Sequence, residues 1–172
     1  MGDVGSGKTL YTARLLEEAV QAGYGRRTTV IDMAPPTMEI RGLRAGGLLA
    51  DYTPSVMEVR YLRPREVKAP RLTARTPREV LEYAEFNRRV IDQLLDAFLK
   101  EPTPILFVND LSIYLQAGSL PRIIQVVEKA ETFIANCYKG EALRDDLGTG
   151  LSRREREAVE RLEGLVDLVV RL

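Results

Sequence analysis

Apolar residues recur along this chain at two spacings, and the spacing changes from one segment to the next. From Thr9 to Ala22 they fall three or four positions apart, which predicts a helix with one apolar face. The apolar members of that face are Leu10, Ala13, Leu16 and Val20.

Short runs of consecutive apolar or β-branched residues alternate with such helical segments, and runs of this length bounded by turn signals are typical of buried strands. Two stretches with the pattern of a capping box, Thr76–Glu79 and Ser152–Glu155, each predict the start of a helix. The predicted strands are Thr28–Ile31, Ile105–Val108, Thr132–Ala135 and Val166–Leu172, and the predicted helices are 76–100, 121–130 and one that begins at Ser152.

The recurring order of helix and then buried strand indicates a fold class. It predicts an α/β protein with a mainly parallel sheet and helices on both faces. No repeat or domain boundary interrupts residues 1–172, so we expect a single domain.

The segment from Met33 to Arg75 is the least regular part of the chain, because it is rich in proline, glycine and arginine. One strand is predicted inside it, from Val56 to Leu62, where polar and apolar residues alternate. Long irregular segments in compact domains are often functional. Its arginines could bind an anionic second substrate or a protein partner, and the ordinary alternative is a solvated surface insertion.

The stretch Gly2–Thr9 has the pattern G-x-x-x-x-G-K-[ST] at every fixed position. Glycines permit backbone angles that other residues avoid and let the backbone approach a phosphate closely. Successive N–H groups can then surround an anion, and the positive end of the following helix adds to the attraction. A glycine-rich helix cap is the ordinary alternative.

This stretch resembles the Walker A motif, or P-loop, of the P-loop NTPase superfamily. The resemblance implies a three-layer P-loop fold, in which Lys8 reaches the β and γ phosphates and Thr9 ligates Mg²⁺. The motif normally follows a buried strand, and only Met1 precedes Gly2 here, so we expect that this first strand is missing from the chain. The residues expected to contact the nucleotide are Gly2, Asp3, Val4, Gly5, Ser6, Gly7, Lys8, Thr9 and Leu10.

Asp110 follows the apolar run Ile105–Val108 after one further residue, and this arrangement resembles the Walker B motif. The resemblance implies that Asp110 holds Mg²⁺. Leu111 stands where RecA- and AAA-type motor ATPases carry a glutamate base. The chain therefore looks closer to the kinase and GTPase half of the superfamily, which includes the SIMIBI group, and fast motor-like hydrolysis is not expected.

Three further polar residues lie at predicted strand ends. Asp32 could orient a water molecule or an acceptor hydroxyl, or could simply cap a turn, and we weigh the two equally. Asn136 and Lys139 are candidates for contacts to the base or ribose. Cys137 and Lys139 occupy positions that are Lys and Asp in the N-K-x-D motif of GTPases, so guanine specificity has no support.

Composition narrows the remaining function classes. The formal net charge is zero, so no global field directs the protein to nucleic acid or to a membrane. No apolar run approaches the roughly 18 residues of a membrane span, and with one cysteine the sequence predicts a cytoplasmic protein. The absence of histidine excludes histidine bases and most zinc sites.

Together these features predict a Mg²⁺-dependent protein that binds a nucleoside triphosphate, ATP more than GTP. It would either hydrolyse the nucleotide slowly or transfer its γ-phosphoryl group, with Lys8 and Asp32 as the candidate catalytic residues. The alternative is a nucleotide-dependent switch or interaction module with little catalytic activity, in which the nucleotide orders Met33–Arg75 for a partner.

Overall fold

A four-stranded parallel sheet forms the centre of the protein, in the order β4-β1-β5-β6. The computed structural model describes residues 1–40 and 42–172. The middle strands are buried along almost their whole length, as expected for a parallel sheet covered on both faces, and the chain is an α/β protein. The strands are β1 (Thr28–Asp32), β4 (Arg60–Leu62), β5 (Ile105–Asn109) and β6 (Thr132–Ala135).

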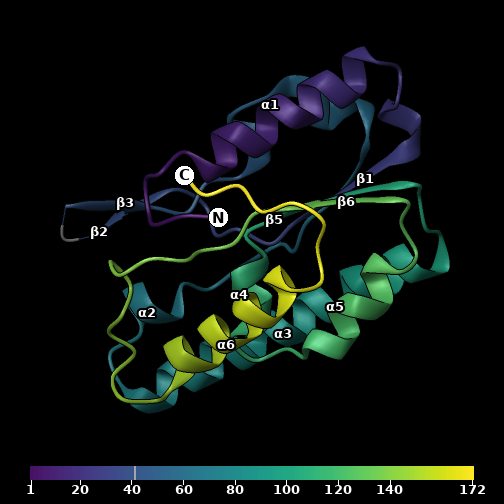
Figure 1. The fold of residues 1–172 in the computed structure, drawn as a ribbon. Coiled ribbons are helices and arrows are strands. Elements are labelled where there is room, and N and C mark those ends of the chain that lie inside the picture. The colour runs from purple at the N-terminus through teal and green to yellow at the C-terminus, as the bar shows by residue number, and fades with distance from the viewer. Residues whose placement is uncertain (41) are drawn as a thin grey trace.

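Helices cover the two faces of this sheet unequally (Figure 1). Helix α1 (Lys8–Gln21) lies on one face, where Leu16 packs in a cluster with Val30 and Phe107. The other helices lie against the opposite face. They are α2 (Pro70–Thr73), α3 (Pro77–Lys100), α4 (Leu111–Leu115), α5 (Leu120–Val127) and α6 (Leu151–Glu163).

The second face has the larger apolar cluster. Ile91 and Leu95 of α3 pack there with Ile31 and Val108, whose side chains point to the side of the sheet opposite to Val30 and Phe107 because neighbouring residues of a strand alternate. The predicted parallel sheet with helices on both faces is therefore confirmed.

Most predicted helix boundaries lie within one or two residues of the observed ones, but the two capping boxes differ from the prediction. Thr76 caps α3 by accepting a bond from the Glu79 amide, and the Glu79 carboxylate accepts from the amide of Arg75 instead of Thr76. Helix α6 has Gly150 as its N-cap instead of Ser152. The left-handed φ of 76° at Gly150 explains why a glycine begins that helix.

The irregular segment contains more secondary structure than the sequence predicts. A hairpin of β2 (Met38–Ile40) and β3 (Leu43–Ala45) precedes two 3₁₀ turns. The predicted strand from Val56 to Leu62 is wrong over its first half, because Pro54–Glu58 forms the second of these turns and only Arg60–Leu62 pairs with β1. Pro54 at the start of that turn favours helical angles over a strand.

The predicted closing strand Val166–Leu172 is wrong as well, because these residues form no strand in the structure. The last residues instead run beside Met1, whose amino group donates to the Val170 carbonyl at 2.5 Å. Gly2 makes an isolated parallel bridge with Tyr138, just beyond β6. These contacts place the start of the glycine-rich loop at the carboxyl ends of the strands.

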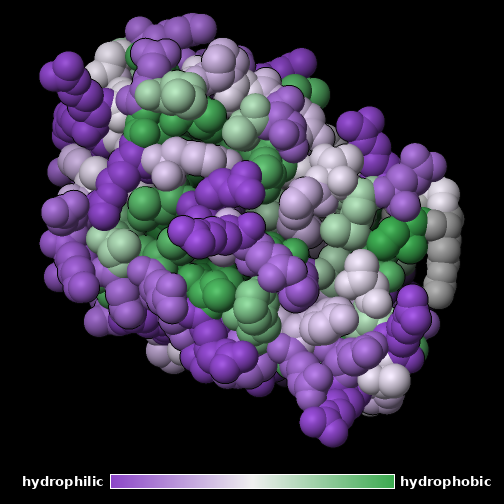
Figure 2. Space-filling view, turned by 180° about the vertical axis from the view of Figure 1, so that it is seen from behind, coloured by the Kyte–Doolittle hydropathy of each residue, from purple (hydrophilic) through white to green (hydrophobic). Residues whose placement is uncertain are grey.

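The surface carries mainly charged and polar side chains. Viewed from behind, groups of apolar residues are separated by hydrophilic ones (Figure 2). Leu10, predicted on the apolar face of α1, is 42% exposed, and that prediction is wrong because the side chain lies at the mouth of a cavity. No helix in the described part of the chain is long and apolar enough to span a membrane.

Candidate phosphate-binding site

The loop Gly2–Gly7 turns back on itself before α1 begins. Gly5 and Gly7 have φ values of 75° and 89°, which residues with a side chain rarely adopt. The Ser6 amide donates to the Asp3 carbonyl at 3.3 Å, and Gly7 is the N-cap of α1 without a side chain to cover the first amides. The free N–H groups and the helix end make this loop suited to an anion.

Asp3 fixes the loop from outside. One oxygen of its carboxylate accepts from the Val4 amide at 2.7 Å, and the other accepts from the amides of Glu141 and Ala142 at 2.9 and 3.3 Å. A Cβ atom at Gly140 would lie 2.2 Å from the Asp3 carboxyl carbon, so this close approach requires glycine. The loop is thus held by the segment that follows β6.

Lys8 bends back over the loop. Its Nζ atom donates to the Asp3 carbonyl at 2.5 Å. Burial lowers the pKa of Lys8, and the nearby carboxylates of Asp110 and Asp3 oppose this shift. An ammonium group with few water contacts gains more from an anion than an exposed one does, which suits Lys8 to a phosphate.

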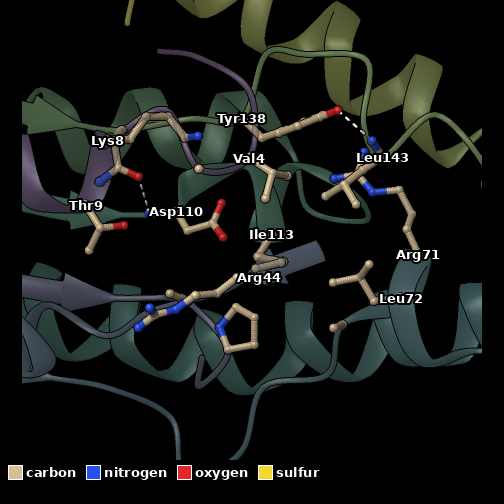
Figure 3. A pocket seen from close by; sticks show the side chains of 18 of the residues that line it. Val4, Lys8, Thr9, Arg44, Arg71, Leu72, Asp110, Ile113, Tyr138 and Leu143 are labelled. Carbon is tan, nitrogen blue, oxygen red and sulfur yellow. Dashed lines mark hydrogen bonds between the residues drawn. The ribbon is translucent and has the colours of Figure 1, made fainter. Parts of the chain in front are cut away.

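A cavity of about 390 Å³ opens beside the loop. In Figure 3, Lys8 and Thr9 lie at one end, Asp110 and Ile113 in the middle, and Arg71 with Leu72 at the other end. The irregular segment forms one wall, with Arg44–Gly47 and Tyr52 among its residues. The volume is within the range of small-molecule sites.

Asp110 directly follows β5 and lies between Lys8 and Arg44 in Figure 3. Its backbone is left-handed, with φ and ψ both 54°, which is uncommon for a residue other than glycine and is often found at functional sites. The carboxylate accepts one hydrogen bond, from the Ser112 hydroxyl at 3.1 Å. Burial raises its pKa, and the positive charge of Lys8 opposes the rise.

Asn136 lines the same cavity, and both hydrogens of its side-chain amide are already engaged. Its Nδ2 donates to the Thr12 hydroxyl and to Asn109 Oδ1, both at 2.8 Å, while its Oδ1 accepts from the Asp110 amide at 2.9 Å. These bonds join α1 to the end of β5. The predicted contact of Asn136 with a base or ribose would displace one of these bonds if Asn136 donates, but its Oδ1 could accept a second hydrogen bond.

Asp32 ends β1 but is turned away from this cavity and is fully buried. It accepts hydrogen bonds from the Leu49 amide at 2.7 Å, the Tyr61 hydroxyl at 2.6 Å, Asn109 Nδ2 at 2.8 Å and the Ala34 amide at 3.2 Å. Burial raises the pKa of Asp32, and these donors oppose the rise. The carboxylate thus caps a turn and holds the irregular segment.

An ion pair closes the far end of the cavity. Arg71 lies 3.0 and 2.9 Å from the two carboxylate oxygens of Glu155, and both side chains are buried. The guanidinium also stacks over the ring of Tyr138, 4.9 Å from its centroid, and Gln116 donates to Glu155 at 2.8 Å. Burial raises the pKa of Glu155 to about 7, although Arg71 lowers it.

Lys139 does not line this cavity. Its Nζ lies 2.9 Å from both carboxylate oxygens of Glu163. It borders a neighbouring cavity of about 230 Å³ on the other side of Arg71 and Glu155. The structure therefore brings the loop, Thr9 and Asp110 together at one cavity, whereas the Lys139 side chain lies outside it and the Lys139 backbone amide donates to the Gly2 carbonyl at 3.0 Å.

Several residues that build this site were not identified from the sequence. Asn109 is the clearest case, because a polar residue inside an otherwise apolar buried strand is a usable signal. Arg71 and Glu155 are 84 positions apart in the chain, so no local pattern could pair them. The role of Asp3 depends on the segment after β6, which approaches it only in the folded protein.

The chain supplies few ligands for a metal ion at this site. No group of three or more His, Cys, Asp or Glu residues capable of holding a metal occurs in residues 1–40 and 42–172. Mg²⁺ usually takes one or two carboxylates, keeps several waters and completes its shell with substrate phosphates. One carboxylate and one hydroxyl, from Asp110 and Thr9, fit that chemistry.

Comparison with known proteins adds no assignment: no family model, no curated protein and no solved structure matches the chain.

Proposed function

We propose that this protein is a Mg²⁺-dependent nucleoside triphosphate-binding domain with a P-loop fold, in which Gly2–Thr9 holds the phosphates. The observation that carries the proposal is the shared cavity at the carboxyl ends of a parallel sheet. Val4, Gly5 and Gly7 of the glycine-rich loop border it together with Lys8, Thr9 and Asp110, and ligands of open parallel sheets bind at this edge.

Each residue of the site has a separate role in this proposal. The loop amides and the start of α1 bind the phosphate oxygens. Lys8 exchanges its bond to the Asp3 carbonyl for a charged contact with phosphate, which is the stronger interaction. Thr9 and Asp110 hold Mg²⁺, and the ion would neutralise charge on the phosphates.

The reaction fitting this site best is slow hydrolysis or transfer of the γ-phosphoryl group. Leu111 follows Asp110, so the chain offers no adjacent glutamate as a base. Asp32 has four donors on its carboxylate, which favours a structural role over the orientation of water. We propose ATP ahead of GTP because the N-K-x-D pattern is absent from Asn136–Lys139.

A second candidate function is a nucleotide-dependent interaction module. It is favoured by one observation: Arg44–Gly47 and Tyr52, all from the irregular segment, form a wall of the cavity. A nucleotide in the loop would contact or approach this wall. The segment's order would then depend on the nucleotide, and a partner would recognise that difference.

Calorimetric titration with MgATP and MgGTP tests the main proposal. We expect Lys8→Ala to weaken binding at least about 100-fold, since it removes a charge-assisted contact in a partly desolvated site. Lys129→Ala, which changes an exposed lysine in the turn after α5, is the matched control and should bind as the wild type does. Equal affinities for Lys8→Ala and the wild type would contradict the proposal.

A further inference from the structure

An unbroken series of side-chain hydrogen bonds leads away from the phosphate end of the cavity. The Thr12 hydroxyl donates to the Lys8 carbonyl at 2.9 Å and accepts from Asn136 at 2.8 Å. Asn136 also donates to Asn109 Oδ1 at 2.8 Å, and Asn109 Nδ2 donates to Asp32 at 2.8 Å. The series crosses from α1 through β6 and β5 to β1.

The far end of this series is the irregular segment. Asp32 accepts from the Leu49 amide at 2.7 Å and from the Tyr61 hydroxyl at 2.6 Å. Asn109 itself also donates to the Gly47 carbonyl at 3.1 Å. Asn109 thus contacts both the residue that holds this segment and the segment's own backbone.

The members of the series are buried from water. Asp32 and Asn109 have no exposed surface, and Thr12 and Asn136 are 3% and 5% exposed. A broken bond here finds no solvent replacement, so the side chains must rearrange together or remain as they are. A buried network with few alternative arrangements can transmit a displacement over its length.

The same series is attached to the candidate metal ligand. Asn136 Oδ1 accepts from the backbone amide of Asp110, whose left-handed backbone (φ 54°) is held in place by its surroundings. A ligand that draws the Asp110 carboxylate toward it therefore acts on the bond to Asn136. A ligand that displaces Lys8 also moves the first turn of α1, and so acts on the hydrogen bond that Thr12 donates to the Lys8 carbonyl.

We infer that Asn109 is a positioning residue that couples occupation of the phosphate end of the cavity to the arrangement of the segment from Ala34 to Leu62. The inference rests on the proposed function, because the nucleotide must occupy the Gly2–Thr9 loop. It goes further by naming the residue that carries the coupling. Coupling of this kind is reciprocal, so the segment's arrangement also changes nucleotide affinity.

A direct contact between the segment and a bound phosphate must be distinguished from coupling through Asn109. Arg44 of β3 lines the cavity close to Asp110 (Figure 3), and its guanidinium could contact a phosphate without any help from Asn109. Arg44→Ala removes the direct route and leaves the buried series intact. Asn109→Ala breaks the buried series and leaves the direct route through Arg44 intact.

Hydrogen exchange at the Leu49 amide is the experiment, because this N–H donates directly to Asp32. Exchange is measured with and without MgATP at a concentration that saturates each variant, with saturation checked by calorimetry. We expect MgATP to slow exchange about tenfold in the wild type and in Arg44→Ala, a typical coupling strength. In Asn109→Ala we expect a change of less than about twofold.

Tyr61→Phe guards against a variant that fails to fold. It removes one hydroxyl from a half-buried ring, retains Asn109, and should reduce the slowing to about threefold at unchanged MgATP affinity. Full slowing in Asn109→Ala, or loss of slowing in Arg44→Ala alone, would overturn the coupling through Asn109. If Asn109→Ala does not fold, full slowing in Tyr61→Phe would overturn it. MgATP binding without slowing in the wild type would overturn this inference and leave the proposed function standing, whereas absence of binding would overturn both.

Discussion

Asp32 and Asp110 lie at the carboxyl ends of neighbouring parallel strands, and the two carboxylates have opposite environments. Asp32 pairs in register with Asn109, one residue before Asp110. Asp32 is fully buried with four donors, whereas Asp110 borders the cavity and, among residues 1–40 and 42–172, accepts a single side-chain hydrogen bond. The sequence offers both as candidates for the same edge of the sheet.

The backbone explains the difference. Asp110 itself has a left-handed backbone, so the chain turns sharply at this residue and enters α4. This turn leaves the Asp110 carboxylate facing the loop. After Asp32 the chain passes into Met33 and Ala34, and the segment that follows folds back over the carboxylate with Leu49 and Tyr61 as donors. A strand-end carboxylate is available to a ligand only where the protein leaves part of its hydrogen-bonding capacity unused.

Replacing Asp32 is expected to give the largest effect on stability. Asp32→Ala removes the acceptor of four buried donors, and we expect the free energy of unfolding to fall by about 4 kcal/mol. Asp32→Asn keeps the size of the side chain and one acceptor and should cost less, about 2 kcal/mol. Urea denaturation measures both.

The same variants separate a structural role from a catalytic one. The folded fraction of Asp32→Asn should bind MgATP within about threefold of the wild type, a difference under 1 kcal/mol. Unchanged stability together with a large loss of MgATP affinity would mean that Asp32, like Asp110, acts on the ligand.

Asp110→Asn is expected to show the opposite behaviour. Asparagine tolerates the left-handed backbone, so the free energy of unfolding should change by less than about 1 kcal/mol. Affinity for MgATP should fall about 10- to 100-fold with the loss of a metal ligand, while affinity for ATP without Mg²⁺ should fall little. Calorimetry with and without Mg²⁺ measures this, with the exposed Asp167→Asn as the control.

Glu155 is a third buried carboxylate, and its titration is expected to have a smaller, pH-dependent effect on the free energy of unfolding. Its pKa in the folded protein is about 7, above the ordinary 4.5. The folded state therefore holds this proton more tightly than the unfolded state, so the stabilisation is complete below pH 4.5 and is lost as the pH rises through 7. Between pH 6 and pH 8 this group should lower the free energy of unfolding by about 1 kcal/mol.

Thermal or urea unfolding of Glu155→Gln over the same pH range tests the predicted direction of this pH dependence. Asp32 and Asp110 also have raised pKa values. Both are present in the two proteins, so only the part of the Asp110 titration that depends on the charge of Glu155 differs between them. We expect a shallower decline with pH in the variant. An unchanged decline would show that Glu155 is ionised throughout this range.

The sequence predicts the regular parts of this fold well, because the relevant signals are local. Apolar runs give β1, β5 and β6, and the N-cap Thr76 begins α3 as expected. The segment after β1 was predicted poorly. Its arrangement depends on Asp32, which contacts Leu49 17 positions further along the chain, and on Asn109, which contacts Gly47 from 62 positions away.

The candidate site likewise has parts that the sequence predicts and parts that it does not. The loop residues and Asp110 form part of short motifs, and the structure brings them to one cavity. Three features depend on tertiary contacts: the hydrogen bonds of Asn136, the position of the Lys139 side chain outside the cavity, and the closure of the cavity by Arg71 and Glu155. A motif gives the identity of a residue, but its free hydrogen-bonding capacity depends on the fold.

The most direct test of the account is a crystal structure of the protein with Mg²⁺ and a non-hydrolysable ATP analogue. The account predicts phosphates on the amides of Gly5–Thr9, Lys8 turned from Asp3 to a phosphate oxygen, and Mg²⁺ on Thr9 and Asp110. Asp32 should keep its four donors. A nucleotide bound elsewhere, or a metal ion on Asp32, would contradict the account.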